Sequence, residues 1–421
     1  MQVENLLSDL VRIQSVNPPG NEGEIAHYLK NLFDAHDISN EIIESSPGRC
    51  SFLAYLGEGD RGLLYLSHLD VVPVSDGWDF EPFSGEIKDG FVHGRGSSDC
   101  KGRVAAEAFA MINLARTGKL GGRLIFAATA DEETGGELGV KYILEKHRNK
   151  LKVDFAINEG GWAPLDGGDK SCWFIGVGEK GGNKVKLISH GVPAHGATPM
   201  MGKNAVVMMA EVVKGLASYR PEIILIPEVR EMLKEISRLY DWNDEITEIN
   251  VDRLITKVVD RQFAAMLSSV TRMTVSPMTI NGGTFGIVPD RCEVETGITV
   301  LPGQDQSYVF GELKDIIGET EIKWPRFQQS TISTTTNGYY GLIKDTLGTF
   351  IGDVLIAPFI LHAPSDSRYL REAGIPSYGL PSWSASNGVH GINEKNPIDN
   401  VRGQSELLKL IAQKYLGFVA N

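Results

Sequence analysis

The chain has 421 residues, of which 42% are hydrophobic and 23% are charged, and its formal net charge at pH 7 is -13. This length exceeds what one ordinary hydrophobic core organises, so it predicts two domains or one domain with a large insertion. The acidic balance argues against nucleic acid or a membrane surface as a partner.

The N-terminal segment predicts two helices and two strands before the first motif. Apolar residues at helical spacing favour helices at 3–13 and 24–33, and strands are expected at 38–44 and 51–56. The segment MQVENLLSDLVRIQS lacks the basic flank and continuous apolar core of a signal peptide. The four cysteines are widely spaced and form no C-x-x-C pair. Such spacing is typical of cytosolic thiols, so we expect a cytoplasmic protein.

The segment 62–72, GLLYLSHLDVV, is the centre of the predicted fold. Its apolar run suits a strand that is buried on both faces of a mainly parallel sheet. Because side chains alternate along a strand, His68 and Asp70 share one face at its carboxyl end, where ligands bind in open α/β sheets. His68 is therefore a candidate metal ligand, with Asp70 behind it to orient the imidazole. The alternative is a structural histidine at a strand end.

A second motif, HGRGSSDCKG, occupies residues 93–102 and precedes a helix expected at 103–116. Asp99 lies just before this helix, where an aspartate commonly caps the first turn. The same position also suits a metal ligand. This motif alone leaves both interpretations open.

Two further apolar strands end in acidic residues. The strand 123–129 leads into Asp131, Glu132 and Glu133, and the short strand 155–157 leads into Glu159. Adjacent acids repel one another and need a counter-charge, which a divalent cation supplies. Acidic decoration of a loop is the alternative. The repeated pattern of an apolar strand followed by a carboxylate favours a metal site.

The character of the sequence changes at Lys180. The predicted elements then follow in this order: an alternating strand at 183–191, a helix, a helix-rich acidic segment at 221–270, strands at 272–280 and 291–301, a helix at 308–317 and a strand at 321–327. Without the helical segment this is the β-α-β-β-α-β order of a ferredoxin-like unit. We therefore expect a catalytic domain formed by residues 1–179 and 330–421 and an inserted domain formed by residues 180–329.

The catalytic domain resumes after the insertion. A helix is expected at 339–351, a strand at 357–361 and a closing helix at 404–416, with the motif VHGINE before the last helix. Together with the N-terminal elements, these predict the α/β class, with a mixed, mainly parallel sheet flanked by helices.

Five residues form the candidate metal set: His68, Asp99, Glu133, Glu159 and His390. Imidazoles with carboxylates suit zinc, with cobalt or manganese as substitutes. Five ligands exceed the need of one tetrahedral zinc with an open position, and they suit two ions that activate a water. A general base must take the proton of that water. Neighbours along extended backbone point opposite ways, so one of Glu132 and Glu133 binds metal while the other faces the water.

The motifs resemble those of the dinuclear zinc amidohydrolases, a family that includes acetylornithine deacetylase, succinyl-diaminopimelate desuccinylase, aminoacylase and glutamate carboxypeptidase. SHLDVVP, GRGSSDCKG, DEETGG, NEGG, AHGATPMMGKNA, IVPDRCE, SDSRYLREAGIP and VHGINE follow the family's order over nearly the whole chain. The resemblance implies that His68, Asp99 and Glu159 bind one zinc ion, and that Asp99, Glu133 and His390 bind the other. Glu132 would then be the general base.

The same resemblance implies a role for the inserted domain as a lid and dimerisation domain. His195, in PAHGATP, would help to hold the oxyanion in the neighbouring subunit's site of a homodimer. The alternative is a loop histidine that caps a turn. The resemblance also predicts a cis peptide bond between Asp99 and Cys100. Cys100 itself replaces the commoner methionine, which we interpret as a packing change.

The chain departs from the family where the substrate's carboxylate is bound. Gly286 stands where an asparagine is usual, and Gly297 and Thr299 replace the D-x-R that precedes the lid's PG. Arg368 and Arg291 are candidate replacements, although each could equally be a structural salt-bridge partner. Asn281 is a further candidate for substrate binding.

The predicted function is hydrolysis of an amide bond in a small substrate that bears a carboxylate. Removal of an acyl group from an N-acyl amino acid and cleavage of a small peptide both fit the motifs. A catalytically silent relative that serves as a binding protein is a third interpretation, although such a protein has no reason to keep Glu132 and the complete ligand set.

Overall fold

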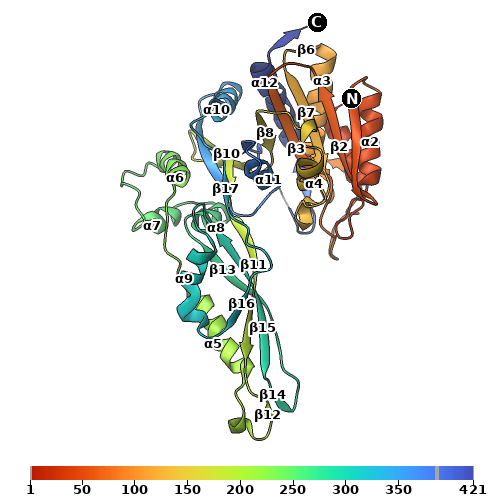
Figure 1. The fold of residues 1–421 in the computed structure, drawn as a ribbon. Coiled ribbons are helices and arrows are strands. Elements are labelled where there is room, and N and C mark those ends of the chain that lie inside the picture. The colour runs from red at the N-terminus through yellow and green to blue at the C-terminus, as the bar shows by residue number, and fades with distance from the viewer. Residues whose placement is uncertain (1, 385–387, 421) are drawn as a thin grey trace.

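The computed structural model describes residues 2–384 and 388–420. Figure 1 shows a broad lobe with a central sheet and both chain termini, and a narrow lobe that extends away from it. None of the helices in the described ranges is both long and apolar enough to cross a membrane.

A large mixed sheet organises the broad lobe. Its strands lie in the order β1 (Ser39–Ser46), β2 (Arg49–Leu56), β7 (Arg123–Thr129), β3 (Gly62–His68), β8 (Phe155–Asn158), β19 (Ser377–Gly379), β10 (Ser171–Glu179) and β17 (Thr331–Ile332). Two more strands, β9 (Trp162–Asp166) and β18 (Leu355–Leu361), also pair with β10. The central strand β3 runs parallel to both β7 and β8.

Every residue of β3 is buried, as its apolar sequence predicts. Leu63 and Tyr65 belong to the hydrophobic core on one face of the sheet, whereas Leu64 and Leu66 belong to the core on the other face. The first core contains side chains of α1 (Val3–Arg12), α2 (Gly23–Asp34), α3 (Lys101–Thr117), α10 (Gly338–Ile351) and α12 (Ile398–Leu416). The second contains side chains of α4 (Val140–Lys146) and α11 (Ser367–Glu372). Helices therefore cover both faces.

Short strands complete the broad lobe. One small sheet has the order β20 (Lys395–Pro397), β5 (Phe91–His93) and β4 (Glu86–Lys88), and a second pairs β21 (Phe418–Ala420) with β6 (Gly118–Leu120). The pairing of β20 with β5 joins the C-terminal segment to the loop that carries Asp99.

The narrow lobe, which we call the lid, is built on an antiparallel sheet. Its order is β13 (Thr274–Gly282), β15 (Arg291–Val300), β11 (Gly181–His190) and β16 (Glu321–Lys323). Helices α5 (Ala205–Ser218) and α9 (Gln306–Ile317) contribute to its core. Element order and strand order match the predicted ferredoxin-like unit. A two-stranded tip of β12 (Ala194–His195) and β14 (Ile287–Val288) lies at the end of the lid farthest from the large sheet (Figure 1).

The helical segment within the insertion packs on the broad lobe. It contains α6 (Pro227–Leu239), α7 (Val251–Ile255) and α8 (Arg261–Val270), whose buried side chains join the larger core of the central sheet. Helix α6 contacts β18 and β10. The division of the chain into domains at residues 179 and 330 stays a proposal. The segment 227–270 falls within the inserted domain by this division, but it packs against the catalytic part of the chain.

Several elements differ from the sequence-based expectations, among them β10, α12 and β16. Strand β10 was not predicted, because Gly176 and Gly178 interrupt its apolar run; a Cβ at Gly176 would lie 2.3 Å from the Gly160 carbonyl oxygen, so the glycine allows a close backbone approach. Helix α12 begins at Ile398 rather than 404, so Gly403 lies inside it, where the Trp383 ring occupies the space that a side chain would fill. Strand β16 ends at Lys323, shortly before Pro325, which has no N–H for the ladder.

Candidate active site

Three candidate ligands meet at the carboxyl ends of the central strands. His68 ends β3, Glu159 directly follows β8, and Asp99 precedes α3. The Nε2 atom of His68 lies 3.0 Å from Oδ1 of Asp99 and 3.8 Å from Oε1 of Glu159. His68 is almost fully buried, so these groups face one another at the edge of the sheet rather than in open solvent.

His390 brings a second imidazole to the same carboxylate. Its Nε2 atom lies 3.0 Å from Oδ2 of Asp99 and 3.1 Å from Oε2 of Glu133. Asp99 therefore presents one oxygen to His68 and the other to His390. A carboxylate shared in this way suits a bridge between two cations.

The electrostatic surroundings of the site favour positive charge. Hydrogen bonds that His390 donates to the carboxylates of Asp99 and Glu133 raise its pKa to about 10. Burial raises the pKa of Glu159 to about 7, with a further increase from the charges of Asp99 and Glu133. The Oε1 atom of Glu133 is buried without a hydrogen-bond partner in the described residues. Imidazole nitrogens and carboxylate oxygens are zinc ligands, so the residues fit a divalent metal.

Cys100 lies closer to the candidate metal ligands than a residue that only fills space in the core would need to lie. Its Sγ atom accepts a hydrogen bond from the His68 backbone N–H at 3.2 Å. Cys100, His68 and Glu159 also bring atoms that could bind a metal ion close to one another. The peptide bond between Asp99 and Cys100 is cis, which confirms the prediction from the resemblance.

Glu132 and Glu133 follow β7 in a 3-10 turn, η1 (Glu132–Thr134), and not in extended backbone as the sequence argument assumed. The turn lets both side chains line one cavity, where Glu133 contacts His390 and Oε2 of Glu132 lies 4.0 Å from Nε2 of His68. Burial raises the pKa of Glu132 well above its ordinary value, and the nearby carboxylates of Glu159 and Asp99 add to this effect.

Asp70 connects His68 to this turn through hydrogen bonds. The Nδ1 atom of His68 lies 3.0 Å from the Asp70 carbonyl oxygen and 3.5 Å from its Oδ1 atom. The Asp70 carboxylate also accepts hydrogen bonds from the backbone N–H groups of Glu132 and Glu133, each at 3.1 Å. Asp70 thus orients the imidazole and holds the acidic turn beside it.

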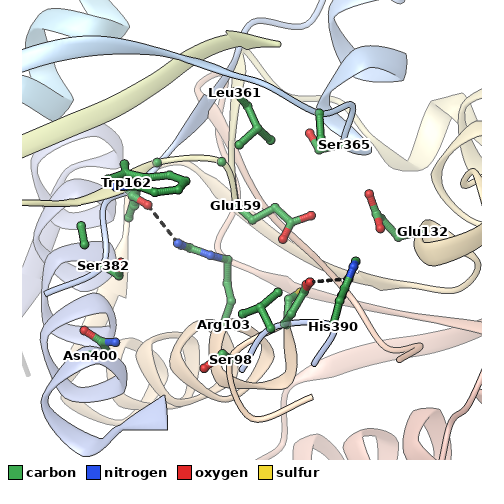
Figure 2. Close-up of a pocket in the computed structure, with 18 of the residues that line it drawn as sticks. Ser98, Arg103, Glu132, Glu159, Trp162, Leu361, Ser365, Ser382, His390 and Asn400 are labelled. Carbon is green, nitrogen blue, oxygen red and sulfur yellow. Dashed lines mark hydrogen bonds and ion pairs between the residues drawn. The ribbon is translucent and has the colours of Figure 1, made fainter. Parts of the chain in front are cut away.

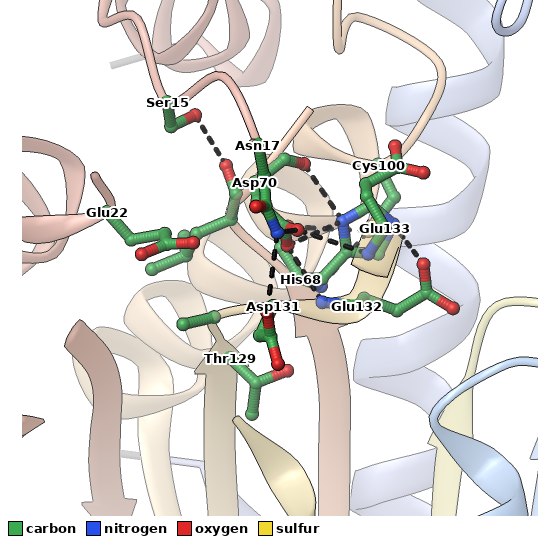
Figure 3. A network of polar contacts seen from close by, with 12 residues as sticks. Ser15, Asn17, Glu22, His68, Asp70, Cys100, Thr129, Asp131, Glu132 and Glu133 are labelled. Carbon is green, nitrogen blue, oxygen red and sulfur yellow. Dashed lines mark hydrogen bonds and ion pairs between the residues drawn. The ribbon is translucent and has the colours of Figure 1, made fainter. Parts of the chain in front are cut away.

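A polar network behind Asp70 was missed by the sequence analysis (Figure 3). Asn17 donates to Asp70 at 2.8 Å and to the Thr134 hydroxyl at 2.9 Å. Arg49 forms ion pairs with Glu22 and with Asp131, each at 2.9 Å. The charge of Asp131 is therefore balanced by Arg49, and only its neighbours Glu132 and Glu133 line the cavity. These partners come from distant segments, and nothing in the local sequence indicates that they meet.

Glu394 supports the loop that carries Asp99. Its buried carboxylate accepts hydrogen bonds from the N–H groups of Gly96, Ser98 and Asp99 at 3.0, 2.9 and 3.1 Å. Its Oε2 atom lies 2.6 Å from Nη1 of Arg95. In the sequence, Glu394 stands out only as the last residue of the VHGINE motif.

A cavity of about 420 Å³ opens beside the candidate metal ligands. Figure 2 shows Glu132, Glu159 and His390 on one side of it, with Trp162, Ser382 and Asn400 on the other. Its volume suits a small substrate.

Besides buried His68 and Asp70, four predicted site residues do not line this cavity in their own chain. His195 is exposed at the lid tip, where its Nδ1 atom accepts a hydrogen bond from the Ala197 N–H at 3.1 Å. Asn281 and Arg291 lie on the lid strands β13 and β15, and Arg291 pairs with Glu293. The guanidinium of buried Arg368 donates to the carbonyl oxygens of Ser365 and Gly135 at 2.9 and 2.7 Å.

Known proteins resemble this chain in sequence and in fold. The sequence model of peptidase family M20/M25/M40 matches residues 64–414. A Staphylococcus aureus (strain MRSA252) protein named probable succinyl-diaminopimelate desuccinylase is 27% identical over 384 residues, covering 87% of this chain and 86% of that protein. An M20 family metallo-carboxypeptidase from Sulfolobus solfataricus aligns with a TM-score of 0.73 at 20% identity, over 99% of both chains. A dinuclear metal binding peptidase of the M20 family from Bacillus subtilis aligns with a TM-score of 0.65 at 14% identity, over 99% of this chain and 98% of that one. The predicted fold class is confirmed.

Proposed function

The chain belongs to peptidase family M20/M25/M40 and is a hydrolase of amide bonds, and from this premise we propose that it removes the acyl group from an N-acyl amino acid. The observation that carries the proposal is Asp99, whose two carboxylate oxygens each face a different imidazole within 3.0 Å, beside the buried carboxylate of Glu132. Cleavage of a dipeptide or of a C-terminal residue is the second candidate, favoured by the fold shared with the metallo-carboxypeptidase.

Two zinc ions are the proposed cofactor, with cobalt or manganese as substitutes. His68, Asp99 and Glu159 would hold one ion, and Asp99, Glu133 and His390 the other. Bound ions of this kind would polarise a carbonyl group and lower the pKa of a bound water molecule. The donor atoms of all five residues support this assignment, since each is an imidazole nitrogen or a carboxylate oxygen.

Glu132 is the proposed general base. It would accept a proton on its free carboxylate from the attacking water and later deliver that proton to the leaving nitrogen, so that the amide C–N bond breaks and a free amine leaves. Removal of its carboxyl group from solvent raises its pKa, which suits a group that must both accept and donate a proton. Asp70 would keep the His68 imidazole and the Glu132 backbone in position during these steps.

His195 is proposed to act in the site of a second copy of the chain. Because its Nδ1 atom accepts the Ala197 N–H, the neutral ring carries its proton on Nε2 and can donate a hydrogen bond to a developing oxyanion. The lid tip also exposes Phe285, Met200 and Met201, large apolar side chains that a homodimer formed through the lid could cover. Capping of a local turn by the same histidine is compatible with this role.

Other partners and the location stay predictions. The net charge of -13 supports the expectation of no nucleic acid and no membrane surface as partner. All four cysteines are buried and unpaired, which agrees with a cytoplasmic location.

A metal-exchange experiment tests the proposal. We expect elemental analysis of the purified protein to find about two zinc-type ions per chain. Stripping with a strong chelator should abolish the release of free amine from N-acetyl and N-succinyl amino acids, and zinc or cobalt should restore it. Dipeptides run in parallel distinguish the second candidate. Absence of bound metal together with activity that survives chelation would overturn the assignment, and metal binding without turnover of any substrate would favour the silent relative.

A further inference from the structure

Arg103 is a buried cation in the wall of the active-site cavity. It lies in the first turn of α3, four residues after Asp99, and its side chain is only 6% exposed. In the part of the chain that the structure describes, it is the one lysine or arginine that lines this cavity. Figure 2 shows its guanidinium turned away from Glu132 and His390, toward Trp162.

The guanidinium of Arg103 is incompletely paired. Its Nη2 atom donates to the Leu380 carbonyl oxygen at 3.2 Å, whereas its Nη1 atom is buried without a hydrogen-bond partner among the described residues. The nearest candidate counter-ion on the same helix, Glu107, uses one oxygen to accept from the Ser67 hydroxyl at 2.6 Å, and its other oxygen has no partner. Arg103 and Glu107 therefore form no close ion pair in the described residues, although the charge of Arg103 partly offsets the rise in the pKa of Glu107 and of Glu159 that burial causes.

In the other buried arginines of the described residues, both terminal guanidinium nitrogens have a partner. Arg49 forms ion pairs with two carboxylates, and Arg95 forms one with Glu394. Arg368 has no ion pair in the described residues, but both ends of its guanidinium donate to carbonyl oxygens. Leaving a buried charge without its partner is strongly unfavourable, so a cation kept in this state is expected to receive a partner from outside the chain.

We propose that Arg103 binds a carboxylate of the substrate through its free Nη1 atom, on the Trp162 side of the cavity. This inference rests on the proposed hydrolase function and adds a residue that determines which amides are accepted. A carboxylate is the partner whose geometry matches a guanidinium, and the resulting hydrogen bond would be charge-assisted at both ends. It would also explain how the chain binds an anionic substrate although Gly297 and Thr299 stand where a lid arginine is expected.

The carboxylate could belong to the acyl group or to the amino acid, and matched substrates distinguish the two. N-succinyl-alanine amide carries it only on the acyl side, N-acetyl-alanine only on the amine side, and N-acetyl-alanine amide on neither. For Arg103→Gln we expect kcat/KM to fall roughly 10- to 100-fold on one of the two charged substrates, the scale of a lost hydrogen bond between charged groups. The uncharged diamide should change less than about threefold.

Two further variants control this comparison. Arg103→Lys keeps the charge without the planar fork and should give an intermediate loss on the same substrate, which separates recognition from misfolding. Arg116→Gln removes an exposed arginine from the other end of α3 and should resemble the wild type on all three substrates. Equal losses on charged and uncharged substrates in Arg103→Gln would overturn the proposal while the hydrolase function stands.

A binding measurement separates failure of this inference from failure of the proposed function. Succinate should raise the melting temperature of the metal-loaded wild type and of Arg116→Gln, and the increase should be lost in Arg103→Gln. If the wild type hydrolyses none of the amides yet succinate binding depends on Arg103, the carboxylate site stands and the hydrolase proposal fails. A succinate effect that survives in Arg103→Gln would place the anion elsewhere and count against Arg103.

Discussion

Asp99 and Glu132 show how two carboxylates in one cavity acquire different roles. Asp99 lies between two imidazoles and accepts from both, which lowers its pKa despite its burial. Glu132 has no such hydrogen bond, and burial raises its pKa well above the ordinary value. The first is therefore suited to hold cations and the second to carry a proton.

At this scale we predict that Glu132→Gln abolishes turnover but leaves the metals in place. The amide has the shape of the carboxylate and cannot accept the proton, so kcat should fall roughly 100- to 10,000-fold. Initial rates and elemental analysis on the same sample measure both effects. Glu137→Gln is a matched control, because Glu137 is an exposed acid a few residues away that pairs with Lys141. Near-normal turnover in metal-loaded Glu132→Gln would assign the base to another residue.

The sequence predicted the residues of the site that belong to motifs at strand ends. His68, Glu159 and the acidic turn follow directly from an apolar run and its last position, so one local pattern locates each. Arg103 was read only as the start of a helix, since nothing in its neighbourhood reveals that its guanidinium enters the cavity. Asn17 and Arg49 were missed for a similar reason, because their partners are brought together only by the folded chain.

The loop before α3 depends on an element from the opposite end of the sequence. Strand β20 pairs with β5, and this pairing brings Glu394 beneath the backbone N–H groups of residues 96–99. Arg95 from the same loop pairs with Glu394. The position of the Asp99 carboxylate is therefore fixed by a contact between segments about 300 residues apart.

We predict that Glu394→Ala weakens both the fold and the metal site. It leaves the Arg95 guanidinium buried and unpaired, which should lower the free energy of unfolding by about 3–5 kcal/mol. The loosened Asp99 loop should also reduce metal affinity roughly 10- to 100-fold. Urea unfolding and competition with a zinc indicator measure the two effects. Glu406→Ala, at a partly exposed α12 residue paired with Lys409, should change neither. Unaltered metal affinity in Glu394→Ala would show that the loop holds its shape without this carboxylate.

Elements with a clean apolar period were predicted closely, whereas strand β10, whose apolar run is interrupted by glycines, was missed. Strand β3 was predicted from its uninterrupted run, and α5, α9 and α10 from their helical spacing. Strand β10 was missed because its glycines resemble a loop in the sequence, although they are what permits close contact with the Gly160 segment. The assignment of 221–270 to the lid followed chain order alone, whereas packing depends on apolar faces that meet only after folding.

The molecule as a whole separates two parts that the proposed mechanism needs together. The metal ligands and Glu132 lie at the sheet edge of the broad lobe, and His195 lies at the distal tip of the lid (Figure 1). An oxyanion donor at that tip can reach a cavity only if the cavity belongs to another copy, or if the lid moves through a large angle. A homodimer in which each lid serves its partner's cavity satisfies the requirement without such movement.

A mixing experiment decides between these arrangements. His195→Ala should lower kcat roughly 100- to 1,000-fold, the scale of one lost oxyanion donor, without loss of metal. If the donor comes from the partner, subunit exchange between His195→Ala and Glu132→Gln should restore activity, since one site of each mixed dimer has an intact Glu132 and an intact partner histidine. With equal amounts and random pairing, about a quarter of all sites should recover. Glu132→Gln mixed with itself measures the background, and exchange is verified with differently tagged chains. No recovery after verified exchange would mean that His195 acts in its own chain through lid closure, or that it has no part in catalysis.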